Sequence, residues 1–162
     1  MTERECLQKL LYGQGAHALT LNSLEGLDEK LARERPANAT HSIYQILAHM
    51  IYWQEYELQK IAGENPSYPA HAGESWLTEP APKNLQALGE TIQRFAEGLK
   101  RYEALLANPA TDLERTIEVK KNETVRDVIV MIIAHNSHHL GQIITLRQQL
   151  GAWPPPKGGD TW

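Results

Sequence analysis

The sequence predicts an all-α fold, a four-helix bundle with a long loop between the second and third helices. Apolar residues recur at spacings of three and four along four separate stretches, which is the period of an amphipathic helix. The 162 residues are 41% hydrophobic, enough for a buried core without disulfides. There is little strand signal, so we expect one helical bundle domain over residues 1–162.

The first helix is predicted from Thr2 to Leu24. Its apolar side chains follow the helical period at Leu7, Leu10, Leu11, Ala18 and Leu21. Gly13 and Gly15 lie in its middle, where we expect them to allow close packing against another helix. With Ala18 they match part of a dinucleotide-binding fingerprint, but that motif must follow a strand and these residues follow a helical pattern.

The second helix is predicted from Ile43 to Ile61. Residues 28–40 before it are polar and contain a proline, which indicates a connection. Ser42 and Gln45 form a capping box, in which each side chain can satisfy the other's free backbone N–H group. Gly63 is a suitable residue to end the helix.

A long loop and a third helix follow. Residues 64–82 contain four prolines, and loops of that length are usually functional or mobile. The third helix is predicted from Lys83 to Ala107, with Asn108 and Pro109 as its stop. We expect residues 113–121 to be irregular or slightly extended.

The last helix has the clearest boundaries. Thr124 and Asp127 form a capping signal, and Gly151 ends the helix. The tail, residues 152–162, contains three consecutive prolines and is expected to be non-helical.

Composition argues against several classes of protein. The net charge is −4 with acids and bases interspersed, so we expect no nucleic-acid partner. No window approaches the roughly 20 apolar residues of a membrane span, and no signal-peptide pattern is present, so no membrane partner is expected. Cys6 is the only cysteine, which suits a reducing compartment. We therefore expect a cytoplasmic protein.

Two histidines interrupt an apolar stripe on the last helix. At about 100° per residue, one narrow face carries Val128, Ile132, His135, His139, Gln142 and Leu146. Burying two imidazoles without partners is costly, and side chains one turn apart can converge on one ion. His138 lies off this stripe and is expected to flank the site or to be solvated. Gln142 is expected to bond a ligand or to make an interhelical hydrogen bond.

Two ligands make a poor site, so a third must come from another helix. His49, in the second helix, is the best candidate, and His17 is its competitor. His41 and His71 are expected to be ordinary polar residues. Pattern alone leaves the choice between His49 and His17 open.

The chain resembles the DinB-like (DinB/YfiT) superfamily of bacterial four-helix bundles. The resemblance rests on residues 135–143, His-Asn-Ser-His-His-Leu-Gly-Gln-Ile, on residues 42–49, Ser-Ile-Tyr-Gln-Ile-Leu-Ala-His, and on Trp-Pro-Pro at 153–155. It implies a divalent metal ion, zinc or nickel first, held by His49, His135 and His139. It also implies frequent homodimers, and we expect the aromatic residues of the second helix to support one.

The expected chemistry follows from an open three-histidine site. Such a site leaves a position for water or substrate, as in catalytic zinc centres. Some relatives use a low-molecular-weight thiol, so we expect a metal-dependent S-transferase or hydrolase acting on a small molecule. The alternative is a non-catalytic metal-binding bundle used in sensing or stress. The zinc-protease motif is absent, because Asn136 follows His135 where that motif has Glu. No catalytic residue can be assigned.

Overall fold

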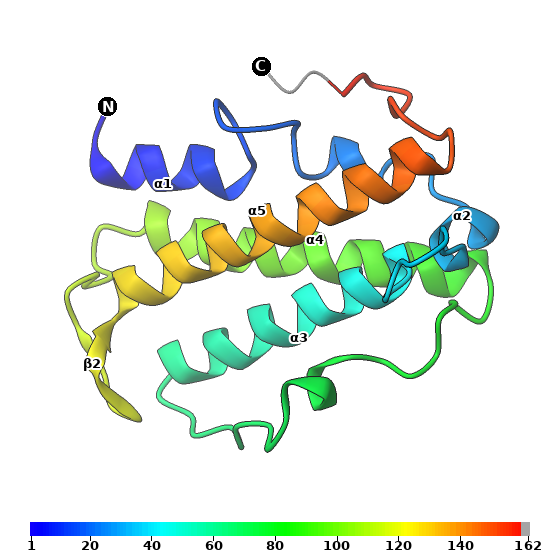
Figure 1. The fold of residues 1–162 in the computed structure, drawn as a ribbon. Helices are drawn as coiled ribbons and strands as arrows, with labels where there is room; N and C mark the ends of the chain where they lie inside the picture. The colour runs from blue at the N-terminus through cyan, green and yellow to red at the C-terminus, as the bar shows by residue number, and fades with distance from the viewer. Residues whose placement is uncertain (160–162) are drawn as a thin grey trace.

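A computed structural model describes residues 1–159, without the side chains of Lys120 and Lys121. The fold is all-α, as predicted (Figure 1). Its four main helices are α1 (Glu3–Leu11), α3 (Ile43–Ile61), α4 (Leu85–Ala107) and α5 (Val125–Gln149). The smaller elements are η1 (Asn22–Leu24), α2 (Glu29–Arg33), η2 (Ala72–Ser75), β1 (Thr116–Ile117) and β2 (Lys120–Thr124). Within the part of the chain that the structure describes, no helix combines the length and apolarity needed to cross a membrane.

The core lies where the long helices meet. Helix α3 packs against both α4 and α5, and α1 packs against the same two helices (Figure 1). Fully buried side chains come from each long helix: Leu47 and Met50, Phe95 and Leu99, Ile129 and Ile132. Each such side chain contributes about 1.5–3 kcal/mol by leaving water. This packing fixes the face of α3 that is turned toward α5.

The first helix is shorter than predicted. It ends at Leu11, and the chain then turns through Gly13 and Gly15, each with φ of 79°. A side chain is disfavoured in that left-handed region, and a Cβ atom on Gly13 would lie 2.5 Å from the ring of His17. The glycines therefore make a turn. The expectation that they allow helix packing was wrong.

The connection before the second long helix also differs from the prediction. Residues 28–40 include the short helix α2, which the sequence pattern did not reveal. The Asp28 side chain accepts a hydrogen bond from the Leu31 amide and so caps its first turn. Five residues are too few for a detectable apolar period, and this explains the error.

The ends of α3 and α5 agree with the prediction. Ser42 with Gln45, and Thr124 with Asp127, form complete capping boxes. Gly63 and Gly151 follow the helix ends with positive φ, as expected of C-terminal glycines. The predicted third helix starts slightly later, at Leu85 after its cap Asn84. These local signals set the lengths of both helices that carry the candidate ligands.

The remaining segments cover the bundle. The expected extended stretch is an antiparallel pair of β1 and β2. Residues 62–84 run along α3 and contain η2 (Figure 1). The buried Arg147 guanidinium donates to the backbone oxygens of Ser23 and Glu25, which ties α5 to the segment after α1. Residues 152–159 are non-helical, as predicted, and the end of the predicted tail, 160–162, lies outside the described residues.

Candidate metal centre

Three histidines from two helices meet where α3 faces α5. His49 lies in the second turn of α3, and His135 and His139 are one turn apart on α5. One ring nitrogen from each lies within 4.8 Å of the other two. His49 and His139 are buried, and His135 is half-buried. The three residues predicted from the sequence are thus brought together and positioned to bind a metal ion.

Backbone and side-chain oxygens orient two of the rings. Nδ1 of His49 donates to the carbonyl oxygen of Ser75 at 3.3 Å, and Nδ1 of His139 donates to Oε1 of Gln142 at 2.8 Å. A carbonyl oxygen only accepts, so the proton of each neutral ring is on Nδ1 and the lone pair is on Nε2. Acceptors in this outer layer are usual around metal-binding histidines. The Gln142 bond to His139, a candidate metal ligand, agrees with the first of its two expected roles, and it lies within one helix rather than between helices.

The spacing of the inner nitrogens fits a metal ion. Nε2 of His49 and Nε2 of His135 face each other at 3.2 Å. Two nitrogen ligands of one tetrahedral zinc ion lie about 3.3 Å apart, because each Zn–N bond is about 2.0–2.1 Å. With the His49 proton held on Nδ1, its Nε2 presents a lone pair toward Nε2 of His135. A proton on Nε2 of His135 satisfies that lone pair as a hydrogen bond. A bound cation would satisfy the Nε2 lone pairs of both rings once His135 carries its proton on Nδ1.

The surroundings keep these imidazoles neutral. Burial, with the neighbouring His139, lowers the pKa of His49 to about 4, and the Ser75 hydrogen bond opposes this only in part. Burial, with His139 and His49, lowers the pKa of His135 to about 3. Burial also lowers the pKa of His139. Because only neutral imidazole binds a metal, the triad is ready for an ion at neutral pH without losing protons.

An aromatic stack covers His49. The indole of Trp76 lies parallel to both His49 and His41, with ring centroids 3.8 and 3.7 Å apart and interplanar angles of 7°. Two rings so close to the indole must cover opposite faces. Trp53 meets His49 and His135 edge-on from α3. The contacts of Trp76, Ser75 and His41 with the site were not predicted from the sequence, because loop residues carry no periodic signal.

The other histidines lie outside the triad. His138 is exposed, as expected, and its Nε2 lies 3.3 Å from Nε2 of Gln142. His17, the competitor to His49, contacts Oγ of Ser137 at 3.0 Å and the Ala18 carbonyl oxygen at 2.8 Å. His71 is exposed. The structure therefore groups His49 with the α5 pair, which the pattern alone did not decide.

A comparison with protein families matches the chain to the DinB superfamily over residues 14–143. The matched segment includes all three histidines of the triad. Searches among curated proteins and among solved structures gave no match.

Proposed function

Because this chain belongs to the DinB superfamily, we propose that it is a metal-dependent enzyme acting on a small molecule, with one divalent ion held by His49, His135 and His139. The observation that supports this most directly is the 3.2 Å approach of two Nε2 atoms whose rings are neutral. Imidazole ligands suit zinc or nickel, which are the ions we propose first. We also propose a cytoplasmic location, because a sequence with a single cysteine suits a reducing compartment.

The ligand set favours catalysis over a purely structural role. Three protein ligands leave a coordination position open, as in catalytic zinc centres. When bound, the ion would polarise a carbonyl group or lower the pKa of a bound water or thiol. Ser75 and Gln142 fix the two ring orientations, while Trp76 and Trp53 exclude water from the His49 side.

We propose that a small molecule reaches this site through a groove lined by His139. It has a volume of about 1000 Å³ and is also lined by His41, Trp76, His138 and Gln142. That volume suits a small ligand. We propose S-transfer from a low-molecular-weight thiol, or hydrolysis, as the reaction. His41 and His138 also line this groove and are not among the proposed metal ligands.

The second candidate is a non-catalytic metal-binding bundle. The described residues that line the groove include no carboxylate, so no Asp or Glu can act there as a general base, and this favours the second candidate. A sensing or stress-related role would need the metal but no turnover.

Metal analysis followed by activity assays tests the proposal. Protein purified without a histidine tag should carry about one zinc or nickel ion per chain, measured by mass spectrometry. Metal-loaded protein should then accelerate transfer of a small thiol to an electrophile, or hydrolysis of an ester, relative to His139→Ala protein. Absence of metal would refute the proposal, and metal without any turnover would favour the second candidate.

We also propose a homodimer, on the family resemblance alone. The aromatic residues of α3 lend it little support, because Tyr56 is buried and Tyr52 and Trp53 are half-buried. They pack on one another, and Tyr68 of the loop covers Trp53 and Tyr56. Light scattering should give twice the chain mass, and a monomer at all workable concentrations would contradict this.

A further inference from the structure

The groove beside His139 differs from two other pockets of the described residues in the charge of its lining. It lies between the loop before α3 and the C-terminal half of α5. Its described lining contains no Asp, Glu, Lys or Arg: Ala37, Asn38, Ala39, Thr40, His41, Ile46, Trp76, His138, His139, Gly141, Gln142, Thr145, Leu146 and Gln149. A groove that must hold a phosphate or several carboxylates would be expected to supply cations.

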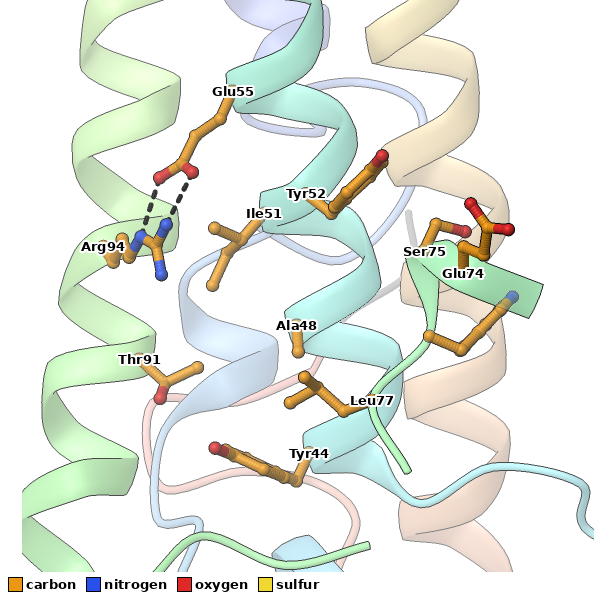
Figure 2. Close-up of a pocket in the computed structure, with 11 residues that line it drawn as sticks. Tyr44, Ala48, Ile51, Tyr52, Glu55, Glu74, Ser75, Leu77, Thr91 and Arg94 are labelled. Atoms are coloured by element: carbon orange, nitrogen blue, oxygen red, sulfur yellow. Dashed lines mark hydrogen bonds and ion pairs between the residues drawn. The ribbon is translucent and has the colours of Figure 1, made fainter. Parts of the chain in front are cut away.

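Two other pockets show that ionised linings occur elsewhere on this chain. A pocket of about 230 Å³, which Trp76 also lines, contains the Glu55–Arg94 ion pair (Figure 2). A third pocket, between α3 and the end of α4, contains Arg101, Asp112 and Arg115. The absence of ionised side chains from its described lining therefore distinguishes the groove beside His139 from these two pockets.

The polar groups of the groove are amides, hydroxyls and the imidazoles of His41, His138 and His139. Asn38, Thr40, Gln142, Thr145 and Gln149 are all exposed to it. Amide side chains both donate and accept, so they match the hydroxyl and amide groups of a ligand. Ile46 and Leu146 add apolar contact. Arg35 is outside the lining, and its guanidinium donates to the carbonyl oxygen of Thr40. Burial, together with the charge of Arg35, lowers the pKa of His41.

We infer that this groove binds the uncharged, hydroxyl- or amide-bearing body of a ligand whose head reaches the metal. A phosphate or a second carboxylate placed there would lose water without gaining a Lys or Arg partner from the described lining. The three ligands of the ion are neutral imidazoles, so a single anionic head, such as a thiolate, is attracted to it. The position of the head rests on the proposed function. The preference for an uncharged body does not.

Two thiols that differ in one group test the inference. Pantetheine has an uncharged body of amides and hydroxyls, and 4′-phosphopantetheine adds one phosphate. Calorimetry on the zinc-loaded full chain should show pantetheine binding at least about five-fold more tightly, because the phosphate finds no cation. Equal or tighter binding of the phosphorylated thiol, or no binding of pantetheine at millimolar concentration, would overturn the inference.

A charge placed in the groove gives the matched control. Gln149→Lys adds a cation to the lining, and Gln148→Lys adds one at the neighbouring exposed position outside it. Gln149→Lys should raise affinity for 4′-phosphopantetheine about five-fold relative to Gln148→Lys, the size of a partly exposed ion pair. Identical behaviour of the two variants would contradict the placement of the ligand.

Failure of the metal proposal can be separated from failure of this inference. Panthenol resembles the pantetheine body but lacks a thiol, and metal-free protein can be titrated with it. Suppose that the chain binds no metal, that it binds panthenol, and that Thr145→Lys lowers its affinity for panthenol. The proposed function then fails and the groove inference stands. If metal binds and panthenol does not, the groove inference fails alone.

Discussion

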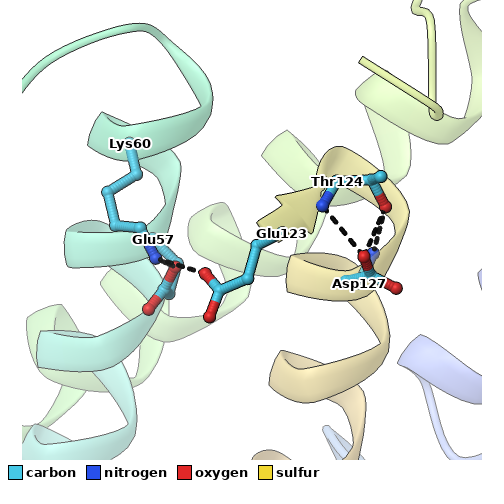
Figure 3. A network of polar contacts seen from close by, with 5 residues as sticks. All are labelled: Glu57, Lys60, Glu123, Thr124 and Asp127. Carbon is cyan, nitrogen blue, oxygen red and sulfur yellow. Dashed lines mark hydrogen bonds and ion pairs between the residues drawn. The ribbon is translucent and has the colours of Figure 1, made fainter. Parts of the chain in front are cut away.

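Helix α3 carries two buried polar clusters of opposite design, the histidine triad at His49 and an ion cluster at Glu57 and Lys60. Lys60 is 2% exposed, and its Nζ lies 2.6 Å from Glu57 and 3.2 Å from Glu123 of β2 (Figure 3). Donor meets acceptor there, and the cluster is complete by itself. At the triad, all three groups are imidazoles, each of which offers one nitrogen as a possible metal ligand. One cluster therefore joins β2 to α3, and the other is suited to an added cation.

The pKa shifts of the two clusters express the same difference. Burial lowers the pKa of Lys60, but hydrogen bonds and charges of Glu57 and Glu123 outweigh it, so that pKa is raised. Burial lowers the pKa of His49 and His135 as well, and neighbouring imidazoles lower it further. Lys60 therefore stays charged and paired, whereas the histidines stay neutral and available as ligands.

The largest expected effect is loss of the metal on removing a ligand. His49→Ala, His135→Ala and His139→Ala should each reduce bound metal from about one ion per chain to near zero, because two ligands make a poor site. Mass spectrometry after dialysis measures this. His138→Ala is the matched control on the same helix and should keep its metal. Loss of metal from His138→Ala with retention in His139→Ala would show the assignment to be wrong by one position.

The next largest effect concerns the ion cluster. Lys60→Met leaves the buried Glu57 without its cation and should lower the free energy of unfolding by about 3–5 kcal/mol. Urea denaturation measures this, and metal content should not change. The double variant Glu57→Leu with Lys60→Met should recover most of the loss. A single variant as stable as the parent would show that the cluster is not a structural clamp.

A smaller effect is expected from the outer layer of the metal site. Gln142→Leu removes the acceptor for Nδ1 of His139 and should weaken metal binding about 10–100-fold. Gln142→Glu keeps an acceptor and should retain affinity. Competition with a chelator of known affinity measures both variants. Equal weakening by the two substitutions would mean that Gln142 acts through packing rather than through its hydrogen bond.

The smallest expected effect is that of mild acid. Unperturbed imidazoles would release metal between about pH 6 and 5. The lowered pKa values of His49, about 4, and His135, about 3, move that release below pH 5. In the unfolded chain these histidines are protonated near pH 6.5, before they are protonated in the folded chain. The free energy of unfolding is therefore highest above pH 6.5 and declines as the pH falls toward the lowered pKa values. A pH series of bound metal and circular dichroism should show metal and helix both retained at pH 5.5. Helix lost together with metal at pH 6 would contradict this.

The sequence by itself determined the features that depend on near neighbours. Capping boxes at Ser42 and Thr124 fixed the starts of α3 and α5, because their partners lie three residues away. The helical period placed His135 and His139 on one inward face. The end of α1 was missed, because the apolar pattern continues past Leu11 although the chain turns at Gly13 with a positive φ, where a Cβ atom would meet the ring of His17.

Only the tertiary structure decided how the site is completed. Nε2 of His49 meets Nε2 of His135 across 86 residues of chain, and Nδ1 of His49 meets the Ser75 oxygen across 26. Trp76 comes to His49 from a loop without a repeating pattern. Such contacts depend on how helices pack and where a loop closes, and many distant side chains share in that free energy. Sequence spacing therefore placed the ligands on their helices, and packing turned His49, rather than His17, toward the α5 pair.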